Sequence, residues 1–297
     1  ARRLPDASRS GGDRTGVVKA LVVGCGDVGT RLGLAWAAAG WEVFGVRRSA
    51  AALQAPIHTV SVDVRDSGTY DALPSDLDHV VYAVAARPPG DEGAYRHAYV
   101  DGVRAVLEHL CRRGSVPRSL VFASSTSVYG QEDGGWVDEG SETMPADFRG
   151  RLLLDAERLV RSWGPEGRVV RLAGIYGPGR THMIDAVRTG GLGCAADGAS
   201  PWTNRIHADD AARLLRFVAE RPAGAPQVFV GADREPAQRD DVVRWLAERL
   251  GVTATHGGAA RTRGGNKRCS SALVRQLGFV FRYPDFRAGY GALLGAS

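Results

Sequence analysis

The sequence predicts an α/β fold, in which a doubly wound parallel sheet is followed by a smaller lobe. Three observations lead to this class. Short apolar runs alternate with amphipathic stretches in the first half of the chain, which indicates strand–helix–strand units. The apolar runs are nearly continuous, as in strands buried on both faces of a parallel sheet. A glycine-rich turn joins the first apolar run to the first amphipathic stretch, where doubly wound folds place a phosphate-binding turn.

The expected elements of the first half follow from these patterns. In the amphipathic stretch 94–113, Val103, Val106, Leu107 and Leu110 recur at helical spacing and predict one buried stripe. A shorter helix is expected at residues 28–39. The expected strands cover residues 17–23, 41–46, 58–62, 79–84 and 118–123.

The second half continues the alternation less regularly. Segments rich in glycine and proline are expected to be loops, which are the natural place for a substrate pocket on a rigid sheet. These loops cover residues 174–180, 190–201 and 257–265. The expected helices cover 152–163, 208–220, 240–250 and 271–277, and the expected strands cover 168–173 and 227–230.

Composition excludes several classes of function. The 297 residues are 44% hydrophobic and 24% charged, which is ordinary for a soluble globular protein. The net charge of +5 is spread along the chain, and no dense basic run with interleaved aromatic residues supports nucleic-acid binding. The apolar runs are too short to span a membrane. The first 16 residues are polar and lack the apolar core of a secretory signal, so we expect a disordered tail and a cytoplasmic location.

The four cysteines are scattered and form no C-x-x-C pair, so neither a zinc site nor a disulfide scaffold is expected. We expect no metal in the site.

The glycine-rich turn has the spacing Gly24-x-Gly26-x-x-Gly29 and stands between a strand and a helix. Gly24 permits the tight turn, Gly26 lets the backbone approach a pyrophosphate, and Gly29 lets helix and strand pack closely. The helix start offers free N–H groups to the anion, so Asp27 and Val28 also belong to the expected cofactor contacts. A glycine-rich turn without a ligand is the alternative, and the surrounding strand and helix disfavour it. The turn predicts a Rossmann-type dinucleotide site.

The type of dinucleotide is predicted from the end of the second strand. An NAD site usually has an acid there for the ribose 2′-hydroxyl, whereas this strand ends in Arg47, Arg48 and Ser49. Two guanidinium groups and a hydroxyl suit a 2′-phosphate, so NADP(H) is favoured over NAD(H), which stays possible. Asp63 is a candidate to bind the adenine amino group, with an Asx turn as its alternative. Further expected cofactor contacts are Val64, Ala83 and Ala85.

We therefore expect three parts. Residues 1–16 form the tail, residues 17–173 form the dinucleotide-binding domain, and residues 174–297 form mainly a substrate-binding lobe, with some elements returning to the sheet.

The chain resembles the extended short-chain dehydrogenase/reductases, the family of nucleotide-sugar epimerases and dehydratases. The resemblance covers nearly all of the chain after the tail. It rests on 61–64 (SVDV), 124–130 (SSTSVYG), 171–179 (RLAGIYGPG), 205–210 (RIHADD) and the ending between Lys267 and Pro284. It implies an NAD(P)-dependent enzyme in which a Ser or Thr, a Tyr and a Lys transfer a proton while the nicotinamide transfers the hydride.

The sequence departs from the family at this proton relay. Ser125 falls at the position of the family's Ser or Thr, beside Ser124. The Tyr-x-x-x-Lys motif should precede a Leu-x-Ala-Glu run, here 154–157, and the two expected positions hold Arg149 and Leu153. Arg149 cannot act as a base because a guanidinium stays protonated. A family asparagine is also replaced by Tyr99.

Other polar residues are candidates to replace the missing pair. The candidate catalytic residues are Ser125, Thr126, Tyr129 and His182, and the candidate substrate-binding residues are Arg149, Tyr176, Arg180 and Arg205. His182 can titrate near neutral pH, although a solvated residue at a helix start is its alternative. Tyr129 has a packing role as its alternative, and His207 is expected to hold the loop before the next helix. Glu157 is interpreted as part of an exposed helix face, paired with Arg161.

Three functions remain open. The first is an NADP(H)-dependent oxidoreductase or epimerase/dehydratase that acts on a small molecule through a non-standard site. The second is a non-redox isomerase or cyclase that retains NADP as a structural element. The third is a binding protein that senses NADP(H). A homodimer is possible, because the resemblance implies pairing through the helices at 94–113 and 152–163.

Overall fold

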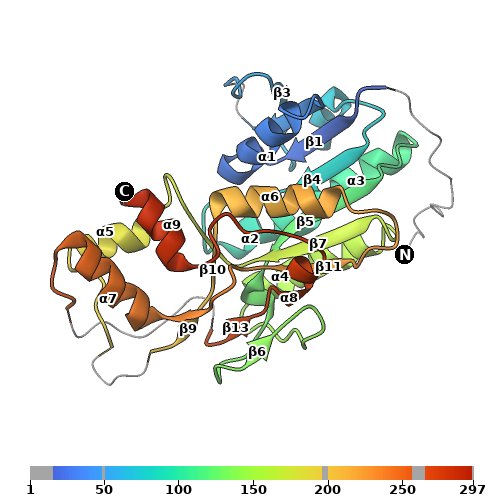
Figure 1. Ribbon diagram of the computed structural model, residues 1–297. Helices are drawn as coiled ribbons and strands as arrows, with labels where there is room; N and C mark the ends of the chain where they lie inside the picture. The colour runs from blue at the N-terminus through green and yellow to red at the C-terminus, as the bar shows by residue number, and fades with distance from the viewer. Residues whose placement is uncertain (1–15, 49–50, 196–199, 256–264, 296–297) are drawn as a thin grey trace. The chain divides into compact units, whose positions relative to one another are not determined.

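The computed structural model describes residues 16–48, 51–195, 200–255 and 265–295 (Figure 1). The chain forms two compact units. Unit 1 consists of residues 1–125, 147–171 and 212–229, and unit 2 consists of residues 126–146, 172–211 and 230–297. The chain therefore passes between the units five times, at 125–126, 146–147, 171–172, 211–212 and 229–230.

The main sheet has seven strands in the order β11-β7-β5-β4-β1-β2-β3. The pairs from β5 to β3 are parallel, with Leu21 opposite both Phe44 of β2 and Val80 of β4. The order reverses direction between β1 and β4, which is the position where doubly wound sheets bind ligands. The strands are β1 (Lys19–Val23), β2 (Glu42–Arg47), β3 (His58–Ser61), β4 (His79–Tyr82), β5 (Ser119–Ser125), β7 (Gly167–Leu172) and β11 (Val228–Gly231).

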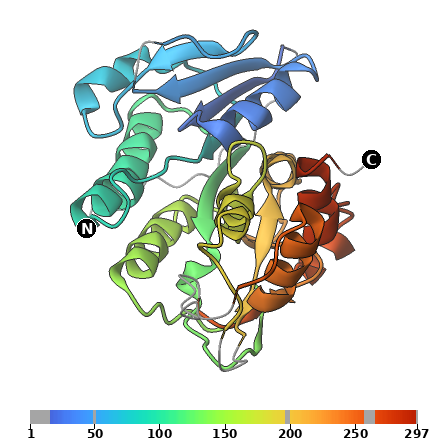
Figure 2. The same cartoon turned by 90° about the vertical axis from the view of Figure 1, so that its left-hand side faces the viewer.

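Helices alternate with these strands, and the predicted doubly wound α/β fold is confirmed (Figure 2). The expected single helix at 94–113 is interrupted, because its first part is a short α-helix followed by a π-helical turn. The helical elements of unit 1 are α1 (Asp27–Ala37), η1 (Ser67–Ala72), α2 (Glu92–Tyr95), the π-turn η2 (Arg96–Asp101), α3 (Gly102–Arg112) and α4 (Phe148–Arg161), together with α6 (Ala208–Ala219), which starts in unit 2.

A buried arginine holds the end of α6 against the sheet. Arg168 of β7 is fully buried, and its guanidinium donates to the carbonyl oxygens of Val218, Arg221 and Pro222 at 2.8 to 2.9 Å. The last carbonyl groups of a helix have no partners within the helix, and a cation near them also complements the helix dipole. The arginine therefore ends α6 without leaving these acceptors unpaired.

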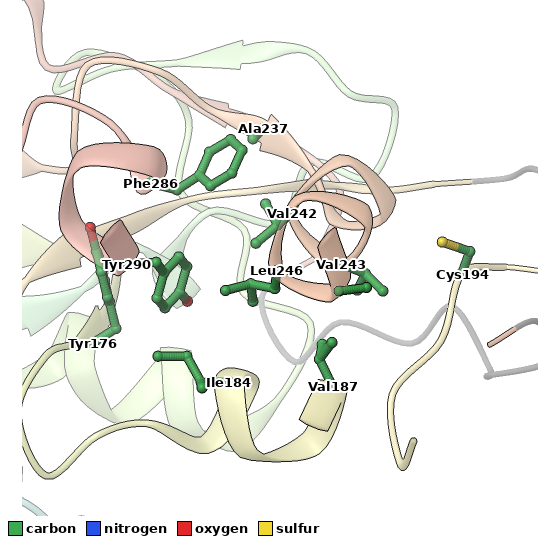
Figure 3. Packing of buried hydrophobic residues seen from close by; sticks show 11 residues of the cluster. Tyr176, Ile184, Val187, Cys194, Ala237, Val242, Val243, Leu246, Phe286 and Tyr290 are labelled. Carbon is green, nitrogen blue, oxygen red and sulfur yellow. The ribbon is translucent and has the colours of Figure 1, made fainter. Parts of the chain in front are cut away.

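Unit 2 has short strands and helices, and its buried side chains form a separate apolar core. Figure 3 shows Tyr176 and Tyr290 on one side of this core, with Ile184 and Val187 facing Val242 and Leu246. Its elements are η3 (Thr126–Val128), β6 (Trp136–Val137), β8 (Gly174–Tyr176), α5 (His182–Arg188), β9 (Trp202–Thr203), β10 (Arg205–His207), β12 (Ala237–Gln238), α7 (Arg239–Leu250), β13 (Arg268–Cys269), α8 (Ala272–Gln276) and α9 (Phe286–Leu293).

In unit 2 the observed secondary structure differs from the secondary structure expected from the sequence. The expected loop 174–180 begins with strand β8, which pairs in parallel with β10. Strands of two or three residues carry no periodic signal, because they are held by a partner that is distant in sequence. Helices α5 and α9 were also not expected. Residues 1–15 of the expected tail and most of the expected loop at 257–265 lie outside the described residues.

Candidate functional site

The glycine loop leaves β1 and turns tightly into α1. The N–H groups of Gly24 and Cys25 donate to the carbonyl oxygen of Val46 at 3.2 and 2.9 Å, which fixes the loop to the end of β2. Gly24 has a φ of +90°, and a Cβ there would lie 2.5 Å from the backbone nitrogen of Val84. No other residue fits, because a side chain would collide with the backbone that follows β4.

The other two glycines of the loop, Gly26 and Gly29, differ in the space around them. A Cβ on Gly29 would lie 2.8 Å from the carbonyl oxygen of Gly24, so this glycine permits close packing of helix and loop. A Cβ on Gly26 would meet no atom within 4 Å. The structure therefore leaves space in front of Gly26, at the start of an 11-residue helix, and this arrangement fits a dinucleotide pyrophosphate.

Asp27, the first residue of α1, places an acid in this loop. Its carboxylate accepts from Arg31 Nε at 2.8 Å, one turn further along the helix. The ion pair offsets the negative charge beside the expected phosphate site. Val28 is buried against the rest of unit 1.

The end of β2 carries the two arginines that the sequence predicts for a 2′-phosphate. Arg47 directly follows Val46, whose carbonyl binds the glycine loop, so both arginines leave the strand beside that loop. Arg47 Nη1 makes one long bond of 3.4 Å to the carbonyl of Ala51, and Arg48 is exposed. Ser49 lies outside the described residues.

Asp63 follows β3 and already has a strong partner. Arg65 donates to its carboxylate from Nε at 2.9 Å and from Nη2 at 2.5 Å, and the Arg65 amide adds a bond of 3.0 Å. The Arg65 hydrogen bond lowers the pKa of Asp63 to about 2. The arrangement is that of the Asx turn, and an adenine amino group would share the carboxylate with Arg65. Val64 follows, half-buried.

The segment after β4 runs beside the glycine loop. The Ala83 amide donates to the carbonyl of Val23 at 2.7 Å, and Ala85, two residues on, is exposed. Together with the contact of Gly24 on Val84, this places 83–85 at the carboxyl ends of β1 and β4. The expected contacts Gly24, Gly26, Gly29, Arg47, Arg48, Ala83 and Ala85 thus lie along one edge of the sheet.

Ser124 and Ser125 end β5, and the first of them belongs to a buried ionic network. Ser124 donates to the Glu157 carboxylate at 2.6 Å, and Arg171 donates to the same carboxylate from Nη2 at 2.8 Å. The side chains of Glu157 and Arg171 are only 3% and 5% exposed. The interpretation of Glu157 as an exposed partner of Arg161 is therefore wrong, because the carboxylate turns inward to β5 and β7.

Helix α4 carries the two positions at which the resemblance predicts Tyr and Lys. Its sequence, FRGRLLLDAERLVR, contains neither residue type. Arg149 Nη1 donates to Asp147 at 2.7 Å, and its guanidinium lies 4.9 Å from the ring centre of Phe148 and 6.0 Å from that of Tyr95. Leu153 is buried. Asp147 also caps the helix by accepting from the Arg149 and Gly150 amides.

The loop after β5 belongs to unit 2 and is held by its backbone and by buried side chains. Tyr129 is 2% exposed, and its hydroxyl donates to the Asp138 carbonyl at 2.6 Å. The buried Lys267 ammonium donates to the Tyr129 carbonyl at 2.9 Å, and burial lowers the pKa of Lys267. Thr126 is buried. These contacts agree with the packing alternative for Tyr129.

The remaining candidates of unit 2 differ in exposure. His182 and Arg180 are exposed at and just before the start of α5. Tyr176 and Arg205 are buried, because they belong to the paired strands β8 and β10. His207 is buried too, and its Nδ1 accepts from the Asp209 amide at 3.2 Å, which agrees with its expected role at the start of α6.

A buried acid that the sequence did not single out lies near Arg205. Asp233 is 1% exposed, and neither carboxylate oxygen has a hydrogen-bond partner of ordinary geometry in the described residues. Burial raises the pKa of Asp233 to about 8, although the Arg205 guanidinium and the Glu235 amide act in the opposite direction. Burial also raises the pKa of Tyr176. An acid directly after an apolar strand, here VFVGAD, is the sequence signal for such a group.

The part of the chain that the structure describes shows neither a metal cluster nor a membrane-spanning helix. In these residues, no cluster of three or more His, Cys, Asp or Glu side chains is arranged to bind a metal ion. No helix among them is both long and apolar enough to cross a membrane.

The sheet order and the open glycine loop between β1 and α1 define a Rossmann-type dinucleotide-binding protein. Residues 20–231 match the profile of the NAD dependent epimerase/dehydratase family. The chain therefore belongs to the NAD-dependent epimerase/dehydratase family, a family of nucleotide-cofactor enzymes, and the resemblance drawn from the sequence is confirmed at this level.

Relatives of known sequence or structure extend over nearly the whole chain. Protein YeeZ of Escherichia coli (strain K12) is 30% identical over 282 residues, which are 90% of this chain and 97% of that protein. A protein from Methylobacillus flagellatus, described as a candidate NAD-dependent epimerase/dehydratase, has a TM-score of 0.79 and 35% identity, covering 95% and 99% of the two chains. MoeE5 in complex with UDP-glucuronic acid and NAD has a TM-score of 0.79 and covers 93% and 98%, and at 23% identity it shows the fold alone.

Proposed function

We propose that the protein is an NADP(H)-binding enzyme that acts on a small molecule, as an oxidoreductase or an epimerase/dehydratase, through a non-standard catalytic site. The observation that carries the proposal is the junction of the glycine loop with the end of β2. There the Val46 carbonyl binds two loop amides, and the chain continues into Arg47 and Arg48 with no acid.

The cofactor preference follows from charge and shape. The space in front of Gly26 and the N–H groups at the start of α1 suit a pyrophosphate. Arg48 is exposed beside this loop, and a guanidinium pairs with phosphate through two hydrogen bonds. An NAD site would need an acceptor for the ribose hydroxyl at this strand end. NAD in the MoeE5 complex supports a nicotinamide cofactor at the level of the fold.

The chain's own residues have separable tasks in this proposal. A bound nicotinamide supplies or takes a hydride. Ser125, at the end of β5, holds the reacting oxygen of the substrate by a hydrogen bond. Arg149 in unit 1 and Arg180 in unit 2 reach the surface, and each is by itself a candidate to bind an anionic substrate group. Tyr176 and Arg205 are buried, so they can bind substrate only if the substrate enters the interior of unit 2.

A second candidate function is a non-redox isomerase or cyclase that keeps NADP as a structural element. One observation favours it. Helix α4 has neither Tyr nor Lys, and its residues at those positions are engaged elsewhere, Arg149 with Asp147 and Leu153 in the core. In that case the nicotinamide stays chemically unchanged during turnover.

Titration of the purified protein with NADPH and with NADH tests the cofactor proposal. We expect the wild-type protein to bind NADPH at least about tenfold more tightly, which is a difference of about 1.4 kcal/mol. Arg48→Glu should abolish this preference, and Arg113→Glu, at an exposed arginine after α3, is the matched control for charge. Equal affinity for both dinucleotides contradicts the NADP preference, and binding of neither contradicts a dinucleotide site.

A turnover experiment separates the two candidate functions. NADPH is mixed with the protein and a panel of aldehydes, ketones and nucleotide sugars, and its absorbance and the products are followed. Substrate-dependent loss of NADPH, or a sugar product formed with transient oxidation of the cofactor, supports the first function. A product formed while bound cofactor keeps its redox state supports the second.

A further inference from the structure

Three polar side chains of unit 2 form a buried cluster. They are Tyr176 of β8, Arg205 of β10 and Asp233, which follows β11, and their exposed fractions are 5%, 4% and 1%. Among the described residues, both carboxylate oxygens of Asp233, Nη1 of Arg205 and the Tyr176 hydroxyl have no hydrogen-bond partner of ordinary geometry. Buried polar groups are nearly always paired, so this cluster requires an explanation.

The backbone brings the three side chains together. The Asp233 amide donates to the Arg205 carbonyl at 2.7 Å, which makes the two residues neighbours. Tyr176 lies opposite His207 in the pairing of β8 with β10, and His207 comes two residues after Arg205. Residues two apart on a strand face the same side, so Tyr176 and Arg205 share one face of this pair of strands.

Arg205 does not hold the Asp233 carboxylate by a direct hydrogen bond. Its Nη2 donates instead to the Thr203 hydroxyl at 2.5 Å, and its guanidinium carbon lies 5.5 Å from the centre of the Phe286 ring. Burial raises the pKa of Asp233 to about 8 and outweighs the opposing effect of Arg205. The acid therefore keeps its proton at neutral pH.

The other titratable groups around Asp233 include no cation. They are Asp285 and Tyr290 of α9, Tyr176 of β8, Cys269 of β13 and the nearby Glu235. Asp285 and Glu235 are acids and raise the pKa of Asp233 further. An ionised Asp233 would thus be a buried charge without sufficient compensation, which is a costly state.

Helix α9 covers the cluster. A Cβ on Gly289 would collide with the Tyr176 hydroxyl oxygen, so the backbone of α9 lies directly on that hydroxyl. The ring centres of Tyr176 and Tyr290 are 4.5 Å apart (Figure 3). Access of water to the cluster from this side requires that α9 moves.

The segment that carries Asp233 is also joined to the start of α9. The Arg234 amide donates to the Pro284 carbonyl at 2.8 Å, two residues before the helix begins. The helix has only eight residues, two of which are glycines, and glycine disfavours a helix interior. Helix α9 therefore depends on its packing, and a change at Asp233 acts where that packing begins.

We propose that Asp233 and α9 form a proton-sensitive switch of unit 2, in which α9 packs over the cluster while Asp233 is protonated and detaches locally when Asp233 ionises. Detachment gives the carboxylate access to water and removes the cost of burying its charge. It also exposes Tyr176 and Arg205, the two buried candidates for substrate binding. The switch goes beyond the proposed function and needs no bound dinucleotide.

The direction of the pH dependence follows from proton binding. With α9 packed, Asp233 keeps its proton up to about pH 8, whereas the ordinary pKa of the group is 3.8. Between these values, detachment of α9 releases a proton. The detached population should therefore rise by up to about tenfold per pH unit and level off above about pH 8.

Hydrogen–deuterium exchange of the full-length protein, followed by mass spectrometry from pH 5 to pH 9, tests the switch. After correction for the intrinsic exchange rates, the protection factors of α9 should fall at least about tenfold between pH 5 and pH 8. They should also stay below those of α7, in the same unit, at every pH. Protection of α9 that is independent of pH overturns the switch. Equal protection of α7 and α9 at every pH shows that unit 2 unfolds as a whole, and overturns the local detachment.

Asp233→Asn assigns the pH dependence to this group, because asparagine has a similar shape and stays uncharged. We expect the protection of α9 in this variant to be independent of pH. Asp185→Asn is the matched control, since Asp185 is an exposed acid on α5 of the same unit, paired with Arg188, and it should keep the wild-type pH dependence. A wild-type pH dependence in Asp233→Asn overturns the proposal. The wild-type profile decides the proposal even if Asp233→Asn does not fold.

Discussion

The resemblance assigns cofactor binding to the glycine loop and proton transfer to helix α4. The two regions differ in how far their groups are already engaged by the rest of the protein. In the loop, a Cβ on Gly26 would meet no atom, so its backbone faces open space. On α4, Arg149 is bonded to Asp147, Leu153 is buried, and Glu157 is bonded to Ser124 and Arg171. The loop leaves open space beside Gly26, whereas the side chains of α4 at these positions hold the fold.

The difference indicates that one fold can keep the backbone geometry for a cofactor without keeping the side chains for proton transfer. The loop depends on backbone geometry, which three glycines and the β2 contact secure. The proton relay that the resemblance implies depends instead on individual side chains.

Glu157→Gln should produce the largest effect, and only on stability. The substitution leaves the Arg171 guanidinium buried without its carboxylate, and breaking such a pair costs roughly 3–5 kcal/mol of unfolding free energy. Urea denaturation measures it. Asp155→Asn, which removes an exposed pair with Arg158 on the same helix, should change the free energy of unfolding by less than about 1 kcal/mol. Equal stability of both variants would show that the buried network is not what holds α4.

Gly26→Ala should affect only binding. Its φ of −86° is open to alanine, and the new methyl group meets no protein atom, so the free energy of unfolding should change by less than about 1 kcal/mol. The methyl group occupies the space proposed for the pyrophosphate, and the Kd for NADPH should rise at least about a hundredfold, or about 2.8 kcal/mol.

Gly24→Ala is the contrast within the same loop. Its Cβ would collide with the Val84 backbone, and its φ is +90°, so this variant should lose stability as well as binding. Wild-type affinity in Gly26→Ala would contradict the assignment of the open space to the cofactor.

Asp233 is a buried acid like Glu157, but it lacks the buried ion pair that Glu157 makes with Arg171, and Asp233→Asn tests its contribution to stability. In the folded protein Asp233 keeps its proton up to about pH 8, whereas its ordinary value is 3.8. Between these values the folded state binds the extra proton, so this group's stabilising contribution is complete below about pH 4 and is lost as the pH rises to about 8.

The expected slope is at most about 1.4 kcal/mol per pH unit, and Asp233→Asn should remove this part of the slope. Urea denaturation from pH 4 to pH 9 measures it in both proteins. Parallel stability curves for the wild-type protein and Asp233→Asn would show that Asp233 is ionised throughout.

Arg65→Ala should have the smallest effect, on the cofactor side of the comparison. The Arg65 bond holds the pKa of Asp63 at about 2, so its contribution is present above the ordinary value of 3.8 and is lost as the pH falls to about 2. Because Arg65 is exposed, salt and water screen the pair, and Tm at pH 7 should fall by less than about 3 °C. A larger loss at pH 7, or one that persists at pH 2, would contradict this account.

The sequence predicts the features that depend on local pattern. The glycine loop, the sheet strands and the Arg47–Arg48 pair are all visible as spacing or alternation, because they rest on backbone geometry and burial of a continuous face. Strand β8 is not visible, since it is defined only by its pairing with β10. The possible homodimer stays a prediction, as do the roles of the individual site residues.

Side chains engaged over long sequence distances also escape the sequence. Glu157 has helical spacing to Arg161 but binds Arg171 and Ser124, because burial against β5 and β7 decides the partner.

A crystal structure of the protein with NADP⁺ tests whether residues 24–29 bind NADP(H) while α4 supplies no proton relay. We predict the pyrophosphate at the start of α1 beside Gly26, and the 2′-phosphate within hydrogen-bond distance of the Arg47 or Arg48 guanidinium. A 2′-phosphate that contacts neither arginine, or a dinucleotide bound away from residues 24–29, would contradict the account.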